Sequence, residues 1–424
     1  MCLRIKAHDG AWRSVEPAGR GGIPVSELQA RSSEVLCDTY HRAPLTIESG
    51  EGAWLISDSG ARLLDCVGGI AVNVLGHGHP GLTSAISVQA QKQIHLSNLY
   101  FSEPQVALAE RLVASAFPSR VFFSNSGAEA NEAAIKMVRK WGSQQERGPH
   151  VVVTLSGAFH GRTLGTLAAT GRAKYSNPFQ PLPEGFRQVR RGDVEALESA
   201  LTPDVVAVLV EPIQGESGIF ALSDSQLQEI RRLCDRYDCL LVVDEIQSGM
   251  GRTGRMWAHQ WSGIVPDLMT VAKGLAGGVP IGATLAGPRA DVFEPGDHGS
   301  TFGGNPLASA AGLAVLDAIE SEHLLENATR VGARLRDGIL GLRSDGLPVL
   351  EVRGRGLMLA VGLRTPIAAA VADAAIDAGL LVNAIGQRTI RLLPPLTIST
   401  AEADLAVERL GVALTAVSRP SVSA

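Results

Sequence analysis

The chain has 424 residues, of which 45% are hydrophobic and 19% are charged, and its formal net charge at pH 7 is −5. A chain this rich in apolar residues and this weakly charged is not intrinsically disordered. The small acidic excess also argues against nucleic acid as the main partner, because neutralising phosphates requires a surplus of lysine and arginine.

Neither a membrane segment nor a metal site is expected. No apolar run approaches the roughly 20 residues that a membrane-spanning helix needs, and residues 1–22 contain no apolar core of a secretory signal. The five cysteines are scattered and include no CxxC pair, so neither a disulfide framework nor a zinc site is supported. We therefore expect a cytoplasmic protein with reduced thiols.

Short apolar runs alternate with amphipathic segments between residues 60 and 315. Four of these runs are expected to be strands: 120–123, 151–155, 205–210 and 240–243. They are nearly continuous, which is typical of parallel strands that are buried on both faces. Amphipathic segments such as 225–237 are expected to be helices. The pattern predicts a doubly wound, mainly parallel α/β sheet with its ligand site at the carboxyl ends of the strands.

The pattern changes after residue 314. Helices are expected over 323–342 and 367–378, and Ser399 with Glu402 forms a capping box for a last helix. Strands are expected over 349–361, 380–384 and 389–393. This part is expected to be a smaller α+β domain.

These patterns predict that the chain is divided into three parts. Residues 1–65 are expected to be an N-terminal segment of the small domain, of which residues 1–35 form a partly ordered extension. Residues 66–314 are expected to be the large domain, and residues 315–424 the C-terminal small domain.

Two charged residues follow buried strands. A carboxylate at Asp244 faces the ligand crevice and needs a cationic or hydrogen-bonding partner, for which a protonated ring nitrogen would serve. Lys273 follows the apolar run 268–272 and precedes glycines, so desolvation would lower its pKa and free the amine to attack a carbonyl. A helix cap for the aspartate and a solvated loop for the lysine are the alternatives.

An anion site is expected where the first strand meets the following helix. Ser126, Gly127 and Ala128 are small, so backbone N–H groups at the helix N-terminus could hold a phosphate. Thr301 lies in a glycine-rich stretch and could add a hydroxyl. Ordinary tight turns would explain both stretches equally well.

Further side chains could bind a planar ligand or a carboxylate. Phe159 follows the strand 151–155 and could stack on a planar ring, and Arg162 offers a planar fork for a carboxylate. Arg391 lies in an apolar run and must be paired if it is buried, with Glu216 as a candidate partner. A core phenylalanine, a surface arginine and a structural ion pair are the alternatives.

Eight segments together resemble the class III (ornithine/acetylornithine) aminotransferases, which use pyridoxal phosphate (PLP). They are GGIAVNVLGHGHP (68–80), FFSNSGAEANEAAIK (122–136), FHGRTLGTLAATG (159–171), EPIQGESG (211–218), DEIQSGMGRTG (244–254), AKGLAGGVPIGA (272–283), HGSTFGGNPLA (298–308) and RLLPPL (391–396). They occur in the family's order and at its spacing, over roughly residues 35–420. The resemblance implies the PLP-dependent transferase fold type I.

The resemblance implies which residues hold the cofactor ring. Lys273 would carry the cofactor as a Schiff base, and Asp244 would pair with the ring nitrogen. Gln247 would bond the phenolic oxygen, and Ile246 and Phe159 would pack on the two ring faces.

The resemblance also implies a phosphate site and a homodimer. Ser126, Gly127 and Ala128 would bind the phosphate, and His160 would lie beside the ring. Thr301 would reach the phosphate from the second subunit.

For the substrates, the resemblance implies two carboxylate sites. Arg162 would bind the α-carboxylate of the donor and Ser300 would touch its acylated part. Glu216 would cover Arg391 in one half-reaction and release it to bind 2-oxoglutarate in the other. Tyr40 would line the entrance.

Within this family, the motif sequences are most similar to those of bacterial acetylornithine aminotransferases. This implies transamination of N2-acetylornithine with 2-oxoglutarate, giving N-acetylglutamate 5-semialdehyde and glutamate by ping-pong kinetics, in arginine biosynthesis or a related pathway. Sister enzymes for ornithine, succinylornithine, succinyldiaminopimelate or 4-aminobutyrate are the first alternative. An aminomutase or racemase is the second, and a noncatalytic binding protein the third. Residues 1–35 and the basic segment 187–193 (RQVRRGD) depart from the family pattern.

Overall fold

The computed structural model describes residues 4–6, 12–14, 25–148 and 150–418. Of the expected N-terminal extension, it describes an antiparallel strand pair and a helix, which are β1 (Arg4–Lys6), β2 (Trp12–Ser14) and α1 (Val25–Val35). The other residues before position 25 lie outside the described part of the chain. Among the residues that are described, no helix has the length and apolar character needed to cross a membrane.

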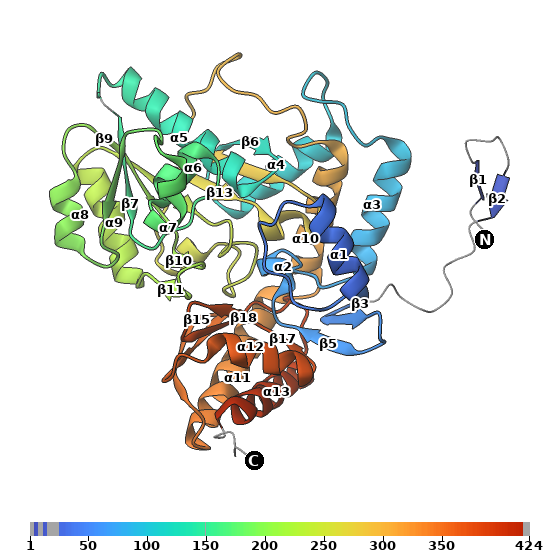
Figure 1. The fold of residues 1–424 in the computed structure, drawn as a ribbon. Helices are drawn as coiled ribbons and strands as arrows, with labels where there is room; N and C mark the ends of the chain where they lie inside the picture. Colours follow the sequence, from blue (N-terminus) through green and yellow to red (C-terminus); the bar gives the residue numbers. More distant parts are fainter. Residues whose placement is uncertain (1–3, 7–11, 15–24, 149, 419–424) are drawn as a thin grey trace.

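A seven-stranded sheet forms the middle of the larger part of the molecule (Figure 1). In spatial order its strands are β6 (Arg120–Ser124), β14 (Gly282–Ala286), β13 (Leu268–Val271), β12 (Leu240–Asp244), β9 (Val205–Val210), β7 (Val151–Leu155) and β8 (Phe186–Val189). β14 is antiparallel to both of its neighbours, and the other adjacent strands are parallel. The predicted mainly parallel α/β sheet is therefore confirmed, with all four strands that the apolar runs indicated.

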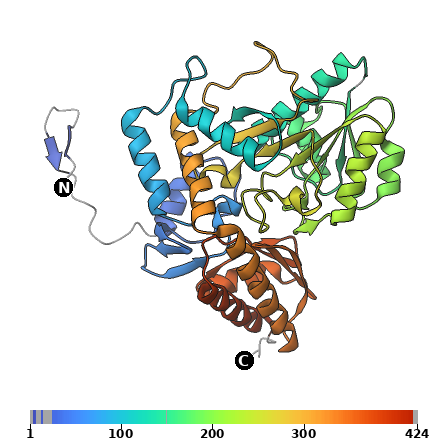
Figure 2. The same ribbon diagram turned by 180° about the vertical axis from the view of Figure 1, so that it is seen from behind.

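Both faces of this sheet are buried, which explains the continuous apolar runs. Val243 and Val242 are neighbours on β12 and point to opposite faces. Val243 belongs to a core that includes α9 (Asp224–Arg236), and Val242 to a second core that includes α5 (Gly127–Gln144). Figure 2 shows the helices on both sides of the sheet.

The other helices of this part are α2 (Gly68–Ala71), α3 (Pro80–Lys92), α4 (Glu103–Ser115), α6 (Leu164–Thr170), α7 (Ala173–Ser176), α8 (Val194–Ala200) and α10 (Pro306–Ser321), with short 3-10 helices at Asn177–Phe179, Ala258–Trp261 and Lys273–Ala276.

The C-terminal part contains an antiparallel sheet that is covered by helices. Its strand order is β15 (Val349–Arg355), β16 (Met358–Leu363), β19 (Thr389–Leu392) and β18 (Asn383–Ile385), and its helices are α11 (Leu324–Ser344), α12 (Ala368–Asp377) and α13 (Thr400–Ser418). The strand expected over 349–361 is instead a hairpin, because Gly356 has a positive φ of 57° and turns the chain back.

The strand expected over 380–384 is also divided, because its two halves join different sheets. β18 pairs with β19, whereas β17 (Leu380–Leu381) joins an N-terminal sheet. That sheet has the order β17, β5 (Arg62–Asp65), β4 (Trp54–Ser57) and β3 (Ile47–Glu51). β5 thus pairs with a strand of the C-terminal part, and β4 and β3 extend the same sheet. The boundaries 1–65, 66–314 and 315–424 stay a prediction.

The predicted capping box is confirmed at the start of α13. Ser399 Oγ accepts from the backbone N–H of Glu402 at 3.2 Å, and a Glu402 carboxylate oxygen accepts from the N–H of Ser399 at 2.8 Å. The other oxygen of Glu402 accepts from the indole of Trp54 on β4 at 2.7 Å. The cap therefore also ties the last helix to the N-terminal sheet.

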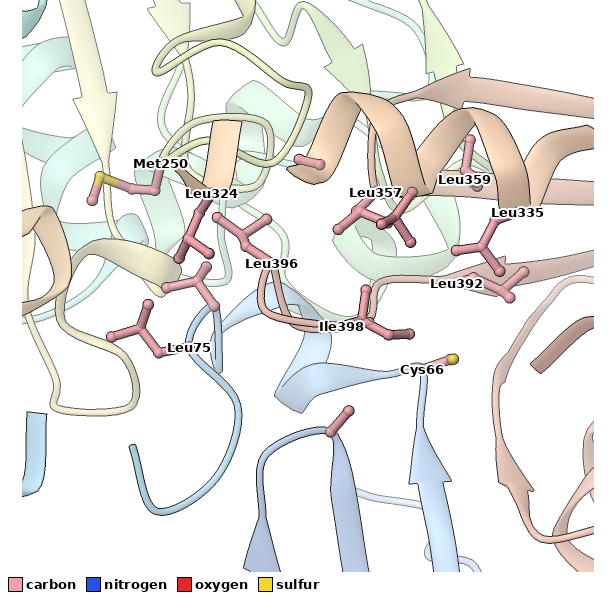
Figure 3. Close-up of a cluster of buried hydrophobic side chains, with 14 of the residues drawn as sticks. Cys66, Leu75, Met250, Leu324, Leu335, Leu357, Leu359, Leu392, Leu396 and Ile398 are labelled. Carbon is pink, nitrogen blue, oxygen red and sulfur yellow. The ribbon is translucent and has the colours of Figure 1, made fainter. Parts of the chain in front are cut away.

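One apolar cluster joins three distant segments of the chain (Figure 3). Cys66 and Leu75 come from the segment between β5 and α3, Met250 from the loop after β12, and Leu324 and Leu396 from the C-terminal part. All five side chains are buried. Because burial of such side chains contributes roughly 1.5–3 kcal/mol each, this cluster is a main connection between the N- and C-terminal parts and the large sheet.

Candidate active site

A cavity of about 370 Å³ opens at the carboxyl edge of the large sheet. It brings together most of the predicted site residues, which are Ser126, Gly127, Ala128, Phe159, His160, Arg162, Glu216, Asp244, Ile246, Gln247 and Lys273. These residues come from loops that follow β6, β7, β9, β12 and β13. The cavity therefore lies where ligands bind in open α/β sheets.

Asp244 ends β12 and is held by hydrogen bonds on both oxygens. Its Oδ2 accepts from Asn131 Nδ2 and lies next to His160 Nδ1, each at 2.8 Å, and its Oδ1 accepts from the N–H of Ile246 at 3.0 Å. Thr270 in turn donates its hydroxyl to Asn131 Oδ1 at 2.7 Å. The carboxylate is fixed in one orientation by groups from four segments.

Lys273 lies on the cavity wall directly after β13. Burial lowers the pKa of its amine below the ordinary value, and the charge of Glu216 opposes this shift. Its φ of 46° is unusual for a residue with a side chain. Such strain persists where the surrounding structure imposes it, and it is concentrated at functional sites.

The N-terminus of α5, where an anion site was predicted, lies on the cavity wall. Ser126 caps the helix, because its Oγ accepts from the N–H of Glu129 at 3.2 Å. The backbone comes so close to Ile246 that a Cβ at Gly127 would lie 2.8 Å from that side chain. The first N–H groups of a helix have no partner within it, and the helix dipole favours negative charge there.

The half-buried Glu216 and the buried Arg391 form an ion pair at the side of the cavity, through Arg391 Nη1 and Glu216 Oε1. Arg391 is only 1% exposed and donates a second hydrogen bond to Asn383 Oδ1 at 2.8 Å. Gln247 Nε2 also donates to Glu216 Oε1, at 3.2 Å. Burial alone would raise the pKa of Glu216, but the charge and hydrogen bond of Arg391 outweigh it, and the pKa is lowered.

Arg162 is an exposed residue at the cavity mouth. Its guanidinium carbon lies 3.9 Å from the ring centre of Tyr175 and 5.4 Å from that of Phe159. A guanidinium over an aromatic face gains a favourable interaction and keeps its N–H groups available.

Four predicted residues do not line this cavity in the single chain. Arg391 lies behind Glu216, and Tyr40 is 71% exposed. Ser300 and Thr301 lie on the long loop before α10, where Ser300 Oγ accepts from Asn125 Nδ2 at 3.2 Å.

Two buried polar residues were not predicted. Asn131 lies on the helix face that packs against the sheet, and its sequence signal is a lone amide among alanines. Glu211 directly follows β9, as Asp244 ends β12, and its Oε1 accepts from the N–H of Phe159 at 2.8 Å. Its Oε2 accepts from the N–H of Gly215 at 3.2 Å, and burial raises the pKa of Glu211 to about 7.

No cluster of histidine, cysteine or carboxylate side chains in the described segments could hold a metal ion. Two buried polar atoms at the site, His160 Nε2 and Gln247 Oε1, have no hydrogen-bond partner within the described residues. An apolar-walled cavity with a carboxylate, a lysine of lowered pKa and an anion site suits a planar ligand with a phosphate.

The model of the class III aminotransferases matches residues 36–414, and the chain therefore belongs to this family. It is a PLP-dependent aminotransferase. Acetylornithine aminotransferase 1 of Bordetella pertussis is 51% identical over 381 residues, which cover 89% of this chain and 97% of that protein. Acetylornithine aminotransferase of Caldanaerobacter subterraneus is 45% identical over 376 residues, or 88% and 96% of the two chains.

Solved structures agree with this assignment. An ornithine aminotransferase of Toxoplasma gondii superposes with a TM-score of 0.90 at 33% identity, covering 93% of this chain and 94% of that chain. An N-acetylornithine aminotransferase of Stenotrophomonas maltophilia K279a does so with a TM-score of 0.79 at 40% identity, covering 92% and 98%. The predicted family, fold type and cofactor are confirmed.

Proposed function

We propose that this aminotransferase moves the δ-amino group of N2-acetylornithine to 2-oxoglutarate, giving N-acetylglutamate 5-semialdehyde and glutamate. The observation that carries this proposal is the Glu216–Arg391 pair beside Lys273 and Asp244. An arginine that can be covered or uncovered lets one cavity accept a monocarboxylate donor and a dicarboxylate acceptor. The names of the relatives with 45–51% identity support the same donor.

The residues of the cavity fit PLP. The N-terminus of α5, with Ser126, Gly127 and Ala128, would bind the phosphate. Phe159 and Ile246 would pack on the ring, and PLP would supply the electron sink for carbanion chemistry when bound.

Asp244 would hold the proton on the ring nitrogen. His160 and Asn131 fix the orientation of its carboxylate through their 2.8 Å contacts with Oδ2. Gln247 would bond the phenolic oxygen of the ring. Because these groups are already ordered, little reorganisation would be needed when the ligand binds.

Lys273 would act as the general base and acid. Because burial lowers the pKa of its amine, the unprotonated form is favoured, and Nζ would take a proton from the substrate carbon that carries the amino group. The same Nζ would return the proton on the cofactor side. Lys273 would thus serve both half-reactions.

The substrate carboxylates would use the two arginines. Arg162 would bind the α-carboxylate, because Tyr175 holds its guanidinium at the mouth of the cavity. Glu216 would cover Arg391 while the donor is bound and move away when 2-oxoglutarate binds. We call the pair Glu216 and Arg391 the gate.

We further propose a cytoplasmic homodimer that serves arginine biosynthesis. Leu99, Tyr100 and Phe101 are 79%, 69% and 100% exposed, and this apolar surface needs a cover. A surface cavity of about 730 Å³ beside it reaches Ser300 on the loop before α10. A second subunit docked there would let Thr301 contribute to the neighbouring phosphate site, with Ser300 and Tyr40 near the donor.

Product analysis tests this proposal. Purified holoenzyme is incubated with N2-acetylornithine and 2-oxoglutarate, and glutamate formation is measured. Ornithine, succinylornithine, succinyldiaminopimelate and 4-aminobutyrate are assayed in parallel. The proposal expects the highest kcat/KM for N2-acetylornithine, and a higher value for any other donor would contradict it.

A further inference from the structure

The gate residue Glu216 lies on a very small hairpin. β10 (Ile213–Gln214) pairs antiparallel with β11 (Phe220–Ala221), and Glu216 lies in the turn between them. An isolated two-stranded hairpin is only marginally stable, even with longer strands. The position of Glu216 must therefore depend on what holds the hairpin from outside.

Two arginines from different sheets lie on the ring of Phe220. The guanidinium carbon of Arg191 is 4.1 Å from the ring centre, and that of Arg353 is 4.3 Å from it. Arg191 follows β8 of the large sheet, whereas Arg353 belongs to β15 of the C-terminal sheet. In Figure 1, β11 lies at the edge of the large part that faces β15.

The same two arginines also donate hydrogen bonds to the hairpin, one to strand β10 and one to the turn. Arg191 Nη1 donates to Gln214 Oε1 at 2.6 Å, and Arg353 Nη2 donates to the carbonyl of Gly218 at 2.9 Å. Burial lowers the pKa of Arg191, and repulsion from the positive charge of Arg353 lowers it further. The hydrogen-bond acceptors of the hairpin and the ring of Phe220 hold both cations in place, and Arg353 also pairs with the carboxylate of Glu351.

We infer that Arg191, Phe220 and Arg353 form a clamp that holds the hairpin in the position where Glu216 covers Arg391. The inference rests on the proposed function, because it assigns a regulator to the proposed gate. It also gives a role to the basic segment 187–193, since Arg191 connects the large sheet to the hairpin and Arg353 connects it to the C-terminal sheet.

The clamp sets the balance between the two half-reactions. With the clamp formed, Arg391 is covered and the monocarboxylate donor is favoured. When the clamp is weakened, the hairpin leaves this position more often, so Arg391 becomes available to 2-oxoglutarate. Arg191 and Arg353 are positioning residues, because they act through Glu216 and do not touch the reacting atoms.

The experiment measures both half-reactions of each holoenzyme by stopped-flow absorbance. N2-acetylornithine is mixed with the PLP form, and 2-oxoglutarate with the pyridoxamine phosphate form. The readout is the ratio of the two apparent second-order rate constants, donor over acceptor. For Arg191→Ala and for Phe220→Leu, we expect this ratio to fall about tenfold.

Two matched variants control for charge and for the ring. Arg190 is exposed, and no hydrogen bond or ion pair of its side chain is seen among the described residues. Arg190→Ala therefore removes the same charge without touching the clamp, and Phe220→Tyr keeps an aromatic face. Both should leave the ratio within about twofold of the wild type.

Three results would overturn the clamp. The first is an equal change of both half-reactions in Arg191→Ala and Phe220→Leu. The second is an equally large change of the ratio in Arg190→Ala, which would indicate long-range steering of anions. The third is an unchanged ratio in both clamp variants.

Glu216→Gln, measured in the same experiment, distinguishes a failure of the clamp from a failure of the gate. If it alters the ratio and the clamp variants do not, only the clamp is refuted. If Glu216→Gln itself leaves the ratio unchanged, the gate of the proposed function fails and the clamp fails with it.

Discussion

The centre around Asp244 and the gate around Glu216 share one cavity but differ in how they are supported. Asp244 ends the central strand of a seven-stranded sheet, and its oxygens are held by Asn131, His160 and a backbone N–H. Glu216 lies on the turn of a hairpin with two residues per strand and pairs with an arginine of another sheet.

This difference matches what each region must do. The Asp244 centre would serve both half-reactions in the same state, so it gains from rigid support. The gate would change partner between the half-reactions, so it gains from a weakly supported segment with two arrangements. Substitutions in the first region should therefore affect both half-reactions equally, and those in the second should affect them unequally.

The largest effect is expected for Lys273→Ala. Removing the group that moves the proton should slow both half-reactions by at least about a thousandfold. Single-turnover absorbance with each substrate measures this, and the content of noncovalently bound PLP shows that the site is intact. Turnover within about tenfold of the wild type would contradict the assignment of Lys273.

A smaller, symmetric effect is expected for Asn131→Ala. Without the amide, Asp244 loses one of its hydrogen bonds and Thr270 loses its acceptor, so the carboxylate is less well oriented. Both half-reactions should slow by about 10- to 100-fold.

Asn327→Ala is the matched control for this prediction. Asn327 donates to the carbonyls of Leu396 and Ile398 at 2.6 and 3.0 Å, outside the cavity. The control should lower the unfolding temperature and leave the rates of folded protein unchanged. Equal rate losses in the two variants would mean that Asn131 acts only on stability.

An unequal effect is expected for Glu216→Ala. Arg391 then stays uncovered, so the donor half-reaction should slow by about tenfold more than the half-reaction with 2-oxoglutarate. The same stopped-flow ratio measures this difference. Similar losses in both half-reactions would remove the contrast between the two regions.

The features that could be predicted from the sequence are those that a local pattern of residues indicates. Continuous apolar runs such as 205–210 predicted buried parallel strands, and strand-end charges such as Asp244 marked the cavity. The strand β14, with the sequence GATLA, gave no such signal because small residues dominate it.

The missed features depend on contacts between distant segments. Asn131 meets Asp244 only when α5 packs on β12, and Leu380 and Asn383 separate only because two sheets compete for them. The packing of the hairpin between Arg191 and Arg353 likewise joins residues far apart in the chain. Local sequence patterns carry no information on such pairs.

The last effect concerns stability, not rate, and its dependence on pH at Glu211, which connects the two regions by accepting from the N–H groups of Phe159 and Gly215. Burial raises the pKa of Glu211 from 4.5 to about 7. Between these pH values the folded protein keeps a proton that the unfolded chain has released. The free energy of unfolding therefore falls as pH rises through this window, by at most about 3 kcal/mol.

Glu211→Gln cannot ionise and should lack this loss. Denaturant unfolding of both proteins at about pH 5 and about pH 8 measures it. Relative to the variant, the wild type should be less stable at the higher pH. A wild type that gains stability relative to the variant as pH rises would mean that Glu211 is held as a carboxylate.

The most direct test of the whole account is a single-turnover measurement on the holoenzyme without keto acid. N2-acetylornithine, ornithine and 4-aminobutyrate are mixed separately with the yellow protein, and conversion to the pyridoxamine phosphate form is followed by absorbance. N2-acetylornithine should convert the holoenzyme fast, and the other two donors should convert it slowly. Faster conversion by ornithine or 4-aminobutyrate, or none by any donor, would contradict it.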